Sequence, residues 1–325
     1  MKKFMKTCAI IALVLFIAGV AMAVTAGTIK GTSAIGDVVE SVTGGKVHVN
    51  LDDLADNWGV FIGEGDSGEN GGYYNISEQD MFSDDYEILE GDVKQDYPGE
   101  EIHSLIVEVS GCTLTLEPTE EENYYVEAND IGKFQCYEED GVLYLKASQP
   151  VGEWKNINKA SKEHAITLYV PIYYSFQDLA VNLGAGIVDM SRIRAQNLDM
   201  EVGAGQINVD GIEACTCQLN AGMGEIVLKD MAVENMQAET GMGHLELSGS
   251  ILESAEVQCS MGAVEMYLSG SEKDYNYEVS AAMGSVTLGG KEYSGFSEEK
   301  EVDNGADVTL QLDCAMGSID VTFAD

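Results

Sequence analysis

The sequence predicts an all-β protein whose main part is a single β-solenoid, a stack of coils of about 19 residues each. Three observations lead to this prediction. A glycine-containing tripeptide recurs at a fixed spacing, apolar and polar residues alternate on both sides of it, and no amphipathic helical period follows the N-terminal segment. The 325 residues include 36 glycines, 4 prolines and 45% hydrophobic residues, enough for a core with many tight turns.

Residues 1–29 have the features of a signal peptide or a signal anchor. Three lysines precede an uncharged run from Thr7 to Ile29, which is long enough to form a membrane helix. Ala21-Met22-Ala23 also fits the small-x-small rule for cleavage. Because the run continues beyond this site, we favour an uncleaved anchor. Both alternatives place the rest of the chain outside the cytoplasm, attached to the cell envelope or secreted.

Residues 30–100 form a distinct acidic block. The part from 31 to 100 contains 17 Asp and Glu but only two lysines, Lys46 and Lys94. A glycine-rich stretch at 63–72 offers few apolar side chains for burial. We therefore predict a largely flexible spacer that holds the following domain away from the membrane.

The β-solenoid itself is predicted to span residues 101–325, with irregular first strands over 101–180 and regular repeats over 181–325. Each repeat carries a small residue, then Ala or Met, then Gly. The final glycines recur at sequence intervals of 19, 19, 19, 19, 22 and 33. These predicted corner glycines are Gly186, Gly205, Gly224, Gly243, Gly262, Gly284 and Gly317.

Alternation with a period of two on both sides of each glycine predicts two short strands that meet at a corner. Residues two and four positions after the glycine, and five and seven before it, are mostly apolar, whereas those between them are mostly polar. Glycine suits the corner because it adopts a positive φ, or accepts a close backbone approach, without a Cβ clash. Stacking would align the inward residues into continuous rows.

The two longer intervals indicate insertions. The interval of 22 holds a small one around Ser271–Tyr275, and the interval of 33 holds Gly289–Asn304, which is rich in charged and aromatic residues. Insertions in stacked repeats commonly protrude as loops that bind partners. We predict that Tyr293 and Phe296 are exposed interaction residues, with burial over the end of the core as the alternative.

The repeats resemble DUF4097, a family of candidate bacterial adhesins built from β-strand repeats. The matching features are the Gly-x-[Ile/Val]-x-[Val/Leu] coils and the segment Ile166-Thr167-Leu168-Tyr169-Val170-Pro171, and the resemblance extends over residues 101–325. It implies an envelope-attached solenoid linked to adhesion or to envelope-stress signalling. It implies no catalytic residues, because none are established for the family.

The charge of the chain excludes two classes of partner. There are 56 Asp and Glu against 17 Lys and Arg, a formal net charge of −39, which repels nucleic acid and anionic lipid headgroups. We therefore expect no nucleic-acid partner, and contact with the membrane through the N-terminal segment only. The expected partners are cell wall, a host surface or an envelope protein.

Cysteines and methionines supply the soft ligand atoms of the sequence. The seven cysteines (8, 112, 136, 215, 217, 259 and 314) form no zinc motif, and we interpret them as small buried hydrophobic residues. Cys215 and Cys217 should point to the same side of a strand. Five methionines hold the middle position of successive corners, and we place them beside cysteines in the inward rows as flexible filling. A Cu(I) site is the alternative. The methionines are Met223, Met242, Met261, Met283 and Met316.

No cofactor is predicted, with calcium as the one ion considered. Asp303, Asn304 and Asp307 offer oxygen ligands in a tight turn, but the turn matches neither the EF-hand loop nor the Gly-Gly-x-Gly-x-Asp calcium repeat. These three residues are the calcium candidates, and diffuse counterion binding to a charged face is the simpler expectation.

The sequence contains no catalytic motif. The four histidines (48, 103, 164 and 244) are scattered, and neither His-Glu-x-x-His nor Gly-x-Ser-x-Gly is present. Abundant carboxylates leave a carbohydrate-active enzyme as a remote alternative. We expect a non-enzymatic surface adhesion or interaction module attached to the cell envelope, or, as the alternative, an extracytoplasmic sensory or regulatory domain of an envelope-stress system.

The expected oligomeric state is a monomer. The last predicted strand, Ser318–Phe323, is expected to form an open end of the stack. An open strand edge invites pairing with another chain unless charged side chains prevent it, and Asp320 and Asp325 are available for that role. End-to-end dimerisation is the alternative.

Overall fold

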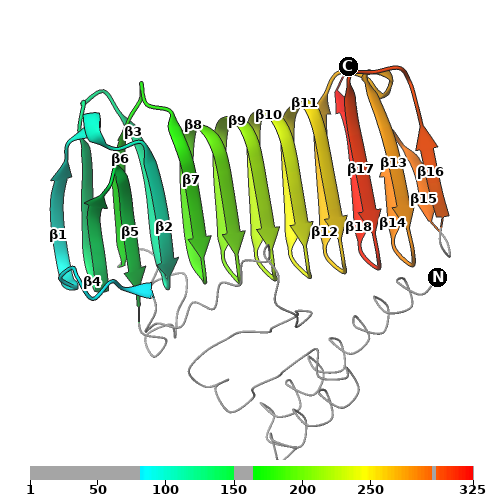
Figure 1. The fold of residues 1–325 in the computed structure, drawn as a ribbon. Helices are drawn as coiled ribbons and strands as arrows, with labels where there is room; N and C mark the ends of the chain where they lie inside the picture. The colour runs from blue at the N-terminus through cyan, green and yellow to red at the C-terminus, as the bar shows by residue number, and fades with distance from the viewer. Residues whose placement is uncertain (1–80, 150–163, 295–297, 325) are drawn as a thin grey trace, which may run out of the picture. The chain divides into compact units, whose positions relative to one another are not determined.

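The computed structural model describes residues 81–149, 164–294 and 298–324, which lie in one compact unit, Glu78–Asp325. Almost all of these residues form β-strands, so the all-β prediction is confirmed (Figure 1). The predicted signal segment, 1–29, and most of the predicted spacer, 30–100, lie outside the described residues. Within the described ranges, no helix has the length and apolar character needed to cross a membrane.

Eighteen strands and two single-turn 3₁₀ helices, η1 (Gly99–Glu101) and η3 (Glu272–Asp274), are described. The strands are β1 (Leu89–Tyr97), β2 (Ser104–Ser110), β3 (Cys112–Thr119), β4 (Tyr124–Glu139), β5 (Val142–Ser148), β6 (Ala165–Pro171), β7 (Phe176–Leu183), β8 (Gly186–Val202), β9 (Gln206–Ala221), β10 (Glu225–Thr240), β11 (His244–Cys259), β12 (Ala263–Ser269), β13 (Tyr275–Ala281), β14 (Ser285–Leu288), β15 (Lys291–Ser294), β16 (Glu298–Val302), β17 (Val308–Cys314) and β18 (Ser318–Ala324).

The repeats stack as parallel coils in two walls. In wall A, β7 pairs with the second half of β8, and the second halves of β9, β10 and β11 follow. In wall B, β3 pairs with the first half of β8, and the first halves of β9, β10 and β11 follow, then β12. The register advances by one repeat per coil, since Ile226 pairs with Ile207 on one side and with Leu245 on the other. The predicted repeat length is therefore confirmed.

The predicted inward rows form the core between the two walls. The apolar residues two and four positions after each corner glycine are all buried, and so are those five and seven positions before it. They belong to one continuous hydrophobic cluster. A single coil buries little apolar surface alone, so the stacking of coils provides the core.

The corner glycines are required by a close backbone approach. A Cβ atom on Gly243 would lie 2.3 Å from the carbonyl oxygen of Gly224 in the neighbouring coil, and one on Gly262 would lie 2.2 Å from that of Gly243. Those same carbonyls accept backbone hydrogen bonds from His244 and Ala263 at 3.0 and 3.1 Å. Any side chain at the corner would therefore disrupt the ladder between coils.

In the regular coils from β8 to β11, positive φ angles occur mainly at the corner opposite the glycine tripeptide. Among the seven predicted corner glycines only Gly186 has a positive φ, of 122°. The opposite corners place Arg192, Gly211, Asp230 and Gly249 in positive φ, again at intervals of one repeat. This second row could not be predicted from the sequence, because its members share a backbone conformation and no single residue type.

The spatial order of the coils differs from their sequence order at the C-terminal end. The coil formed by β17 and β18 lies between the coil of β11 and β12 and that of β13 and β14. The prediction that the last strand is an open end of the stack is thus wrong. The irregular spacings follow from this order. In the interval of 22, the chain skips one coil position. In the interval of 33, it forms the end strands β15 and β16 and then returns to the skipped position as β17.

The predicted binding insertion instead covers the end of the stack. β15 pairs antiparallel with β14, and β16 pairs antiparallel with β13. Tyr293 lies opposite Val286 and is only 3% exposed, so the prediction of an exposed aromatic residue there is wrong. The strand folds back and turns this ring onto the core, in agreement with the alternative prediction. Phe296 lies outside the described residues.

The other end of the stack follows the same plan. The coil of β2 and β3 lies one step inside the coil of β5 and β6, and β4 covers both outer strands in antiparallel orientation. β1 then pairs antiparallel with β4. Since β1 lies within the predicted spacer, the β-structure begins before the predicted boundary at residue 101.

Replacing a corner glycine tests the close approach. We expect Gly243→Ala to lower the free energy of unfolding by about 1–3 kcal/mol, because the added methyl group forces the backbone of two coils apart. Gly222→Ala is the matched control: its Cβ would meet the nearest carbonyl at 3.3 Å, and Ser260, Ala282 and Ala315 occupy the same position in other coils. Denaturant unfolding of both variants provides the measurement, and equal losses would contradict the explanation.

Candidate functional site

A row of methionines runs along the outer edge of the corners. In spatial order the row comprises Met223, Met242, Met261, Met316 and Met283, and we call it the Met ridge. Each backbone N–H after the first donates to the coil before it, at 2.7–2.8 Å, so the row is continuous over five coils. The first two coils carry Ala185 and Ala204 at the same position.

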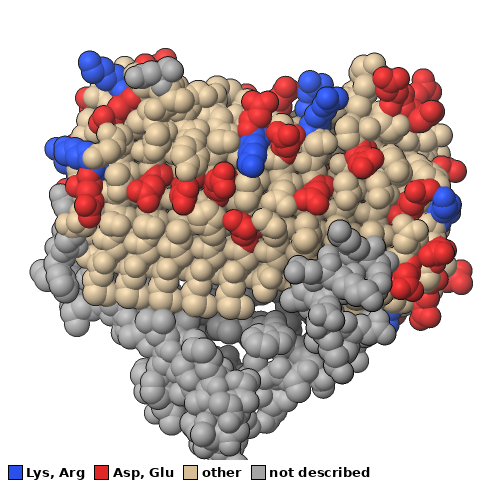
Figure 2. All heavy atoms as spheres, turned by 180° about the vertical axis from the view of Figure 1, so that it is seen from behind, with Lys and Arg blue, Asp and Glu red and all other residues tan. Residues whose placement is uncertain are grey.

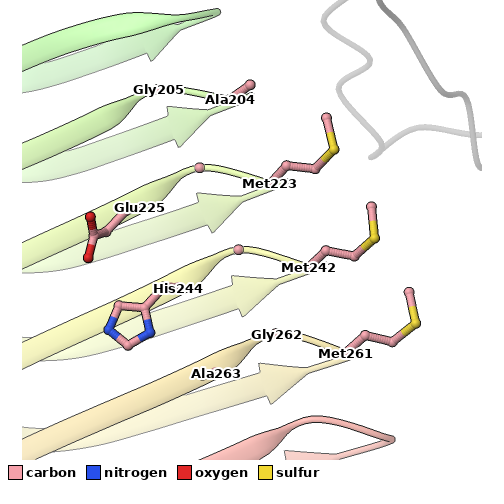
Figure 3. A pocket seen from close by; sticks show the side chains of 11 residues that line it. Ala204, Gly205, Met223, Glu225, Met242, His244, Met261, Gly262 and Ala263 are labelled. Atoms are coloured by element: carbon pink, nitrogen blue, oxygen red, sulfur yellow. The ribbon is translucent and has the colours of Figure 1, made fainter. Parts of the chain in front are cut away.

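The Met ridge faces outward, so the prediction that these methionines fill the inward rows is wrong. Met223, Met242 and Met283 are 54%, 44% and 50% exposed, and the other two are partly buried. Figure 3 shows the side chains of Met223, Met242 and Met261 extending in parallel to one side of the corner. The middle residue of each corner has to point outward because the residues on either side pack against the neighbouring coil.

A shallow, open groove runs beside the ridge. It is lined by the corner residues of four coils, among them the three methionines of Figure 3 and the side chains of Glu225 and His244. Glu225 and His244 extend away from the thioether groups in this view. The groove therefore has an apolar, sulfur-rich border and a separate polar border.

The charged residues lie mainly away from this edge. Figure 2 shows Asp and Glu side chains distributed across the back of the β-unit, while the visible left part of its lower border, where the corners lie in Figure 1, carries no charge. An exposed apolar stripe within such an acidic surface is a typical feature of an interaction site. Methionine is common in surfaces that adapt to a partner.

The cysteines take two different orientations. Cys217, Cys259 and Cys314 are buried in the inward rows as predicted, and burial raises the pKa of the Cys217 thiol to about 12. Cys215 is exposed, so the prediction that it points the same way as Cys217 is wrong. The alternation is interrupted there, because Cys215 and Thr216 both face outward. All six cysteines within the described residues are free thiols.

Two carboxylates on the face of wall A are perturbed. Desolvation by the surrounding sheet raises the pKa of Asp199 and of Glu201, and the charge of Asp199 raises the pKa of Glu201 further. Their neighbours on wall A are largely amide and hydroxyl side chains; Thr216 donates to Asn197 at 2.8 Å, for example. No basic residue pairs with Asp199 or Glu201 in the described hydrogen bonds and salt bridges.

One serine–histidine contact occurs in the described residues. His103 Nδ1 lies 3.0 Å from Ser104 Oγ, and Ser104 donates to Asp178 Oδ2 at 3.4 Å. In a catalytic triad the carboxylate orients the histidine, whereas here it contacts the serine. Ser104 is also only 4% exposed. The arrangement is thus a polar contact at the start of β2 in which the serine hydroxyl is buried and is not an accessible nucleophile.

The calcium candidates form a turn organised by a neighbouring strand. Asn276 Oδ1 accepts the backbone N–H groups of Asn304 and Ala306 at 2.9 and 3.2 Å, and Asn304 Nδ2 donates to the carbonyl of Tyr275 at 2.7 Å. These bonds explain the turn containing Asp303 and Asp307 without an ion. Among the described residues, no group of three or more His, Cys, Asp or Glu side chains could hold a metal.

The raised pKa of Asp199 predicts a pH-dependent stability. A carboxyl whose pKa is higher in the folded state is penalised when it ionises, so the folded protein loses stability as pH rises through that range. Because the Asp199 side chain is exposed, we expect Asp199→Asn to be only slightly more stable than the parent at neutral pH and to lose this advantage in acid, where the carboxyl is protonated in both states. Asp210→Asn controls for the removal of one negative charge, and unfolding curves at both pH values test the difference.

No curated protein matches the sequence. A candidate adhesin from Bacteroides fragilis NCTC 9343 has 14% identity and a TM-score of 0.38, covering 72% of this chain and 98% of its own. A candidate cell adhesion protein from Clostridium sporogenes ATCC 15579 has 12% identity and a TM-score of 0.32, covering 72% and 100%.

A further solved structure, described as a candidate lipid binding protein from Parabacteroides distasonis ATCC 8503, has 15% identity and a TM-score of 0.34, covering 71% and 96%. The family model of Toastrack DUF4097 matches residues 102–295, which is more than half of the sequence and includes most of the stacked coils. The resemblance inferred from the repeats is thereby confirmed: the chain belongs to the Toastrack DUF4097 family.

Proposed function

We propose that this protein is a non-enzymatic surface interaction module of the cell envelope and that the Met ridge is its contact surface. The ridge is the observation that carries the proposal. It presents a continuous apolar edge on a regular β-framework whose other surfaces are rich in Asp and Glu. Apolar patches that persist on an acidic surface favour a partner that covers them.

The chemistry of the ridge indicates the kind of partner. A net charge of −39 disfavours anionic surfaces, and it allows contact with neutral or basic ones. Flexible thioether side chains adapt to irregular apolar shapes. Peptide stems of the cell wall, a neutral or basic host surface and another envelope protein all meet these conditions. The segment 1–29 would supply attachment to the membrane.

Charge substitution on the ridge tests this proposal. Full-length protein reconstituted into neutral liposomes is incubated with purified cell wall or with mucin, and retention is measured. We expect Met223→Glu combined with Met242→Glu to reduce retention by at least about tenfold, a loss of about 1.4 kcal/mol. Both positions are about half exposed, so the fold should tolerate the change.

Leu252 provides the matched control. It is 52% exposed, comparable with Met223. It lies within β11, near the corner of the coil opposite His244 and the Met ridge. Leu252→Glu should leave retention unchanged. Equal losses in the two variants would indicate a general charge effect and would refute the ridge as contact surface.

The alternative function is an extracytoplasmic sensory or regulatory domain of an envelope-stress system. If the parent protein is retained by neither cell wall nor mucin, but instead co-purifies with a membrane protein, this alternative replaces adhesion. Glycan hydrolysis is the remote alternative; it needs a suitably placed pair of carboxyl groups, and turnover of a glycan by the parent protein would establish it.

We also infer that the stack is a β-solenoid and that it is monomeric. The parallel register, which advances by one repeat per coil, supports the first inference. Charged side chains on the outer strands support the second: β16 carries Glu299, Lys300 and Glu301, and β1 carries Glu90 and Asp92. Charged edge strands resist pairing with another chain. Light scattering of the full-length protein, corrected for bound detergent, should give the mass of one chain, and twice that mass would refute the inference.

A further inference from the structure

We propose that the Met ridge binds a soft monovalent metal ion, Cu(I), through the thioether sulfurs of Met223, Met242 and Met261. This inference is independent of the proposed adhesion, because it concerns the sulfur atoms of the ridge and not its apolar character. The methionines of the ridge lie outside the core. Buried side chains would have had a packing role, whereas these have none that requires sulfur.

The donor set selects the class of metal. Thioether sulfur is a neutral, soft ligand that favours Cu(I) over hard cations such as Ca²⁺ or Mg²⁺. Glu225 and His244 line the same groove but extend away from the sulfurs, so oxygen and imidazole ligands do not complete the set. An all-thioether site also disfavours Zn²⁺, which is bound in proteins by Cys, His and carboxylate side chains.

The backbone places the three sulfurs within reach of one another. Met242 donates its backbone N–H to Gly222, and Met261 donates to Gly241, both at 2.8 Å, so the three residues occupy successive rungs. Rungs of a sheet are about 4.8 Å apart. Each methionine has three rotatable side-chain bonds, which allows the outer two sulfurs to turn towards an ion beside the central one.

The row of methionines is continuous in space, although its members do not all follow one another in sequence order. Met316 follows Met261 in space, and Met283 follows Met316, although the coil that carries Met316 is the last one in the sequence. Each neighbour in the three-dimensional stack thus extends the same line of thioethers. The residues that follow the corner vary from coil to coil, from Glu225 to His244 to Ser318, so they form no common ligand set.

Access and charge also favour a cation. Met223 and Met242 are about half exposed, so an ion reaches the sulfurs without opening the core. The net charge of −39 raises the concentration of cations near the surface. The buried thiols of Cys217, Cys259 and Cys314 lie inside the core and are not part of this site.

The experiment uses Ag(I) as a redox-inert substitute for Cu(I). Full-length protein carrying Cys8→Ser and Cys215→Ser, in detergent and without chloride, is labelled with carbon-13 at the methionine methyl groups. Silver nitrate is then titrated while the methyl resonances are followed. We expect the signals of Met223, Met242 and Met261 to move together and saturate, while the signal of the buried Met236 stays in place.

Leucine substitution separates metal binding from apolar contact. The triple variant Met223→Leu, Met242→Leu, Met261→Leu keeps the apolar ridge but removes its sulfurs. In competition with a chromophoric Cu(I) chelator under anaerobic conditions, its affinity for Cu(I) should fall at least about tenfold relative to the parent. Met236→Leu should not change the affinity. Retention on cell wall or mucin should survive the triple leucine change, because the ridge stays apolar.

Several results would overturn the proposal. Ridge methyl signals that stay in place with excess Ag(I), or that move equally with Zn²⁺, would show that the thioethers hold no soft metal. An unchanged Cu(I) affinity in the triple leucine variant would place the metal on the cysteines. Loss of retention in the leucine variant with an unchanged Cu(I) affinity would show that the thioethers serve docking and not metal binding.

Discussion

The close contact between backbones at the glycine corners is the constraint on which the rest of this structure depends. Each corner carbonyl accepts a hydrogen bond from the next coil at a point where no Cβ fits. This contact fixes the phase of every coil relative to its neighbour, so the register advances by one full repeat at each step. With the phase fixed, inward side chains form continuous rows and a single core results. The same contact leaves the middle corner residue no direction except outward.

Stacked parallel coils leave two open ends, and the chain closes both in the same way. Antiparallel strands lie across the terminal coils, β4 with β1 at one end and β15 with β16 at the other. The first and last coils of the sequence take positions one step inside these ends. Their strands consequently have hydrogen-bonded partners on both sides. The outer edges that remain carry charged side chains, which limits further growth of the sheet.

Sequence reasoning predicted the parts of this fold that obey a local period. Alternation of two identified the inward rows, and the recurring glycine tripeptide identified the corners. The prediction of side-chain direction failed where this alternation does not apply. Met242 lies inside a tight turn, and Cys215 lies where the alternation is interrupted. The spatial order of the coils also could not be predicted from the sequence, because every coil offers nearly the same edge for pairing. Tyr293 was misplaced for a related reason, since nothing local distinguishes a protruding loop from an end strand.

The Met ridge combines a rigid base with flexible tips, and this combination explains why its two proposed roles are compatible. The base is set by backbone hydrogen bonds of 2.7–2.8 Å, so the positions of the Cα atoms vary little along the row. The tips are unbranched thioethers that change rotamer at low cost. An apolar partner needs only their surface, whereas a soft cation needs their sulfur atoms. Leucine has the first property and lacks the second. A row of leucines would present a comparable apolar surface without a metal ligand, so replacing the methionines by leucine separates the two roles.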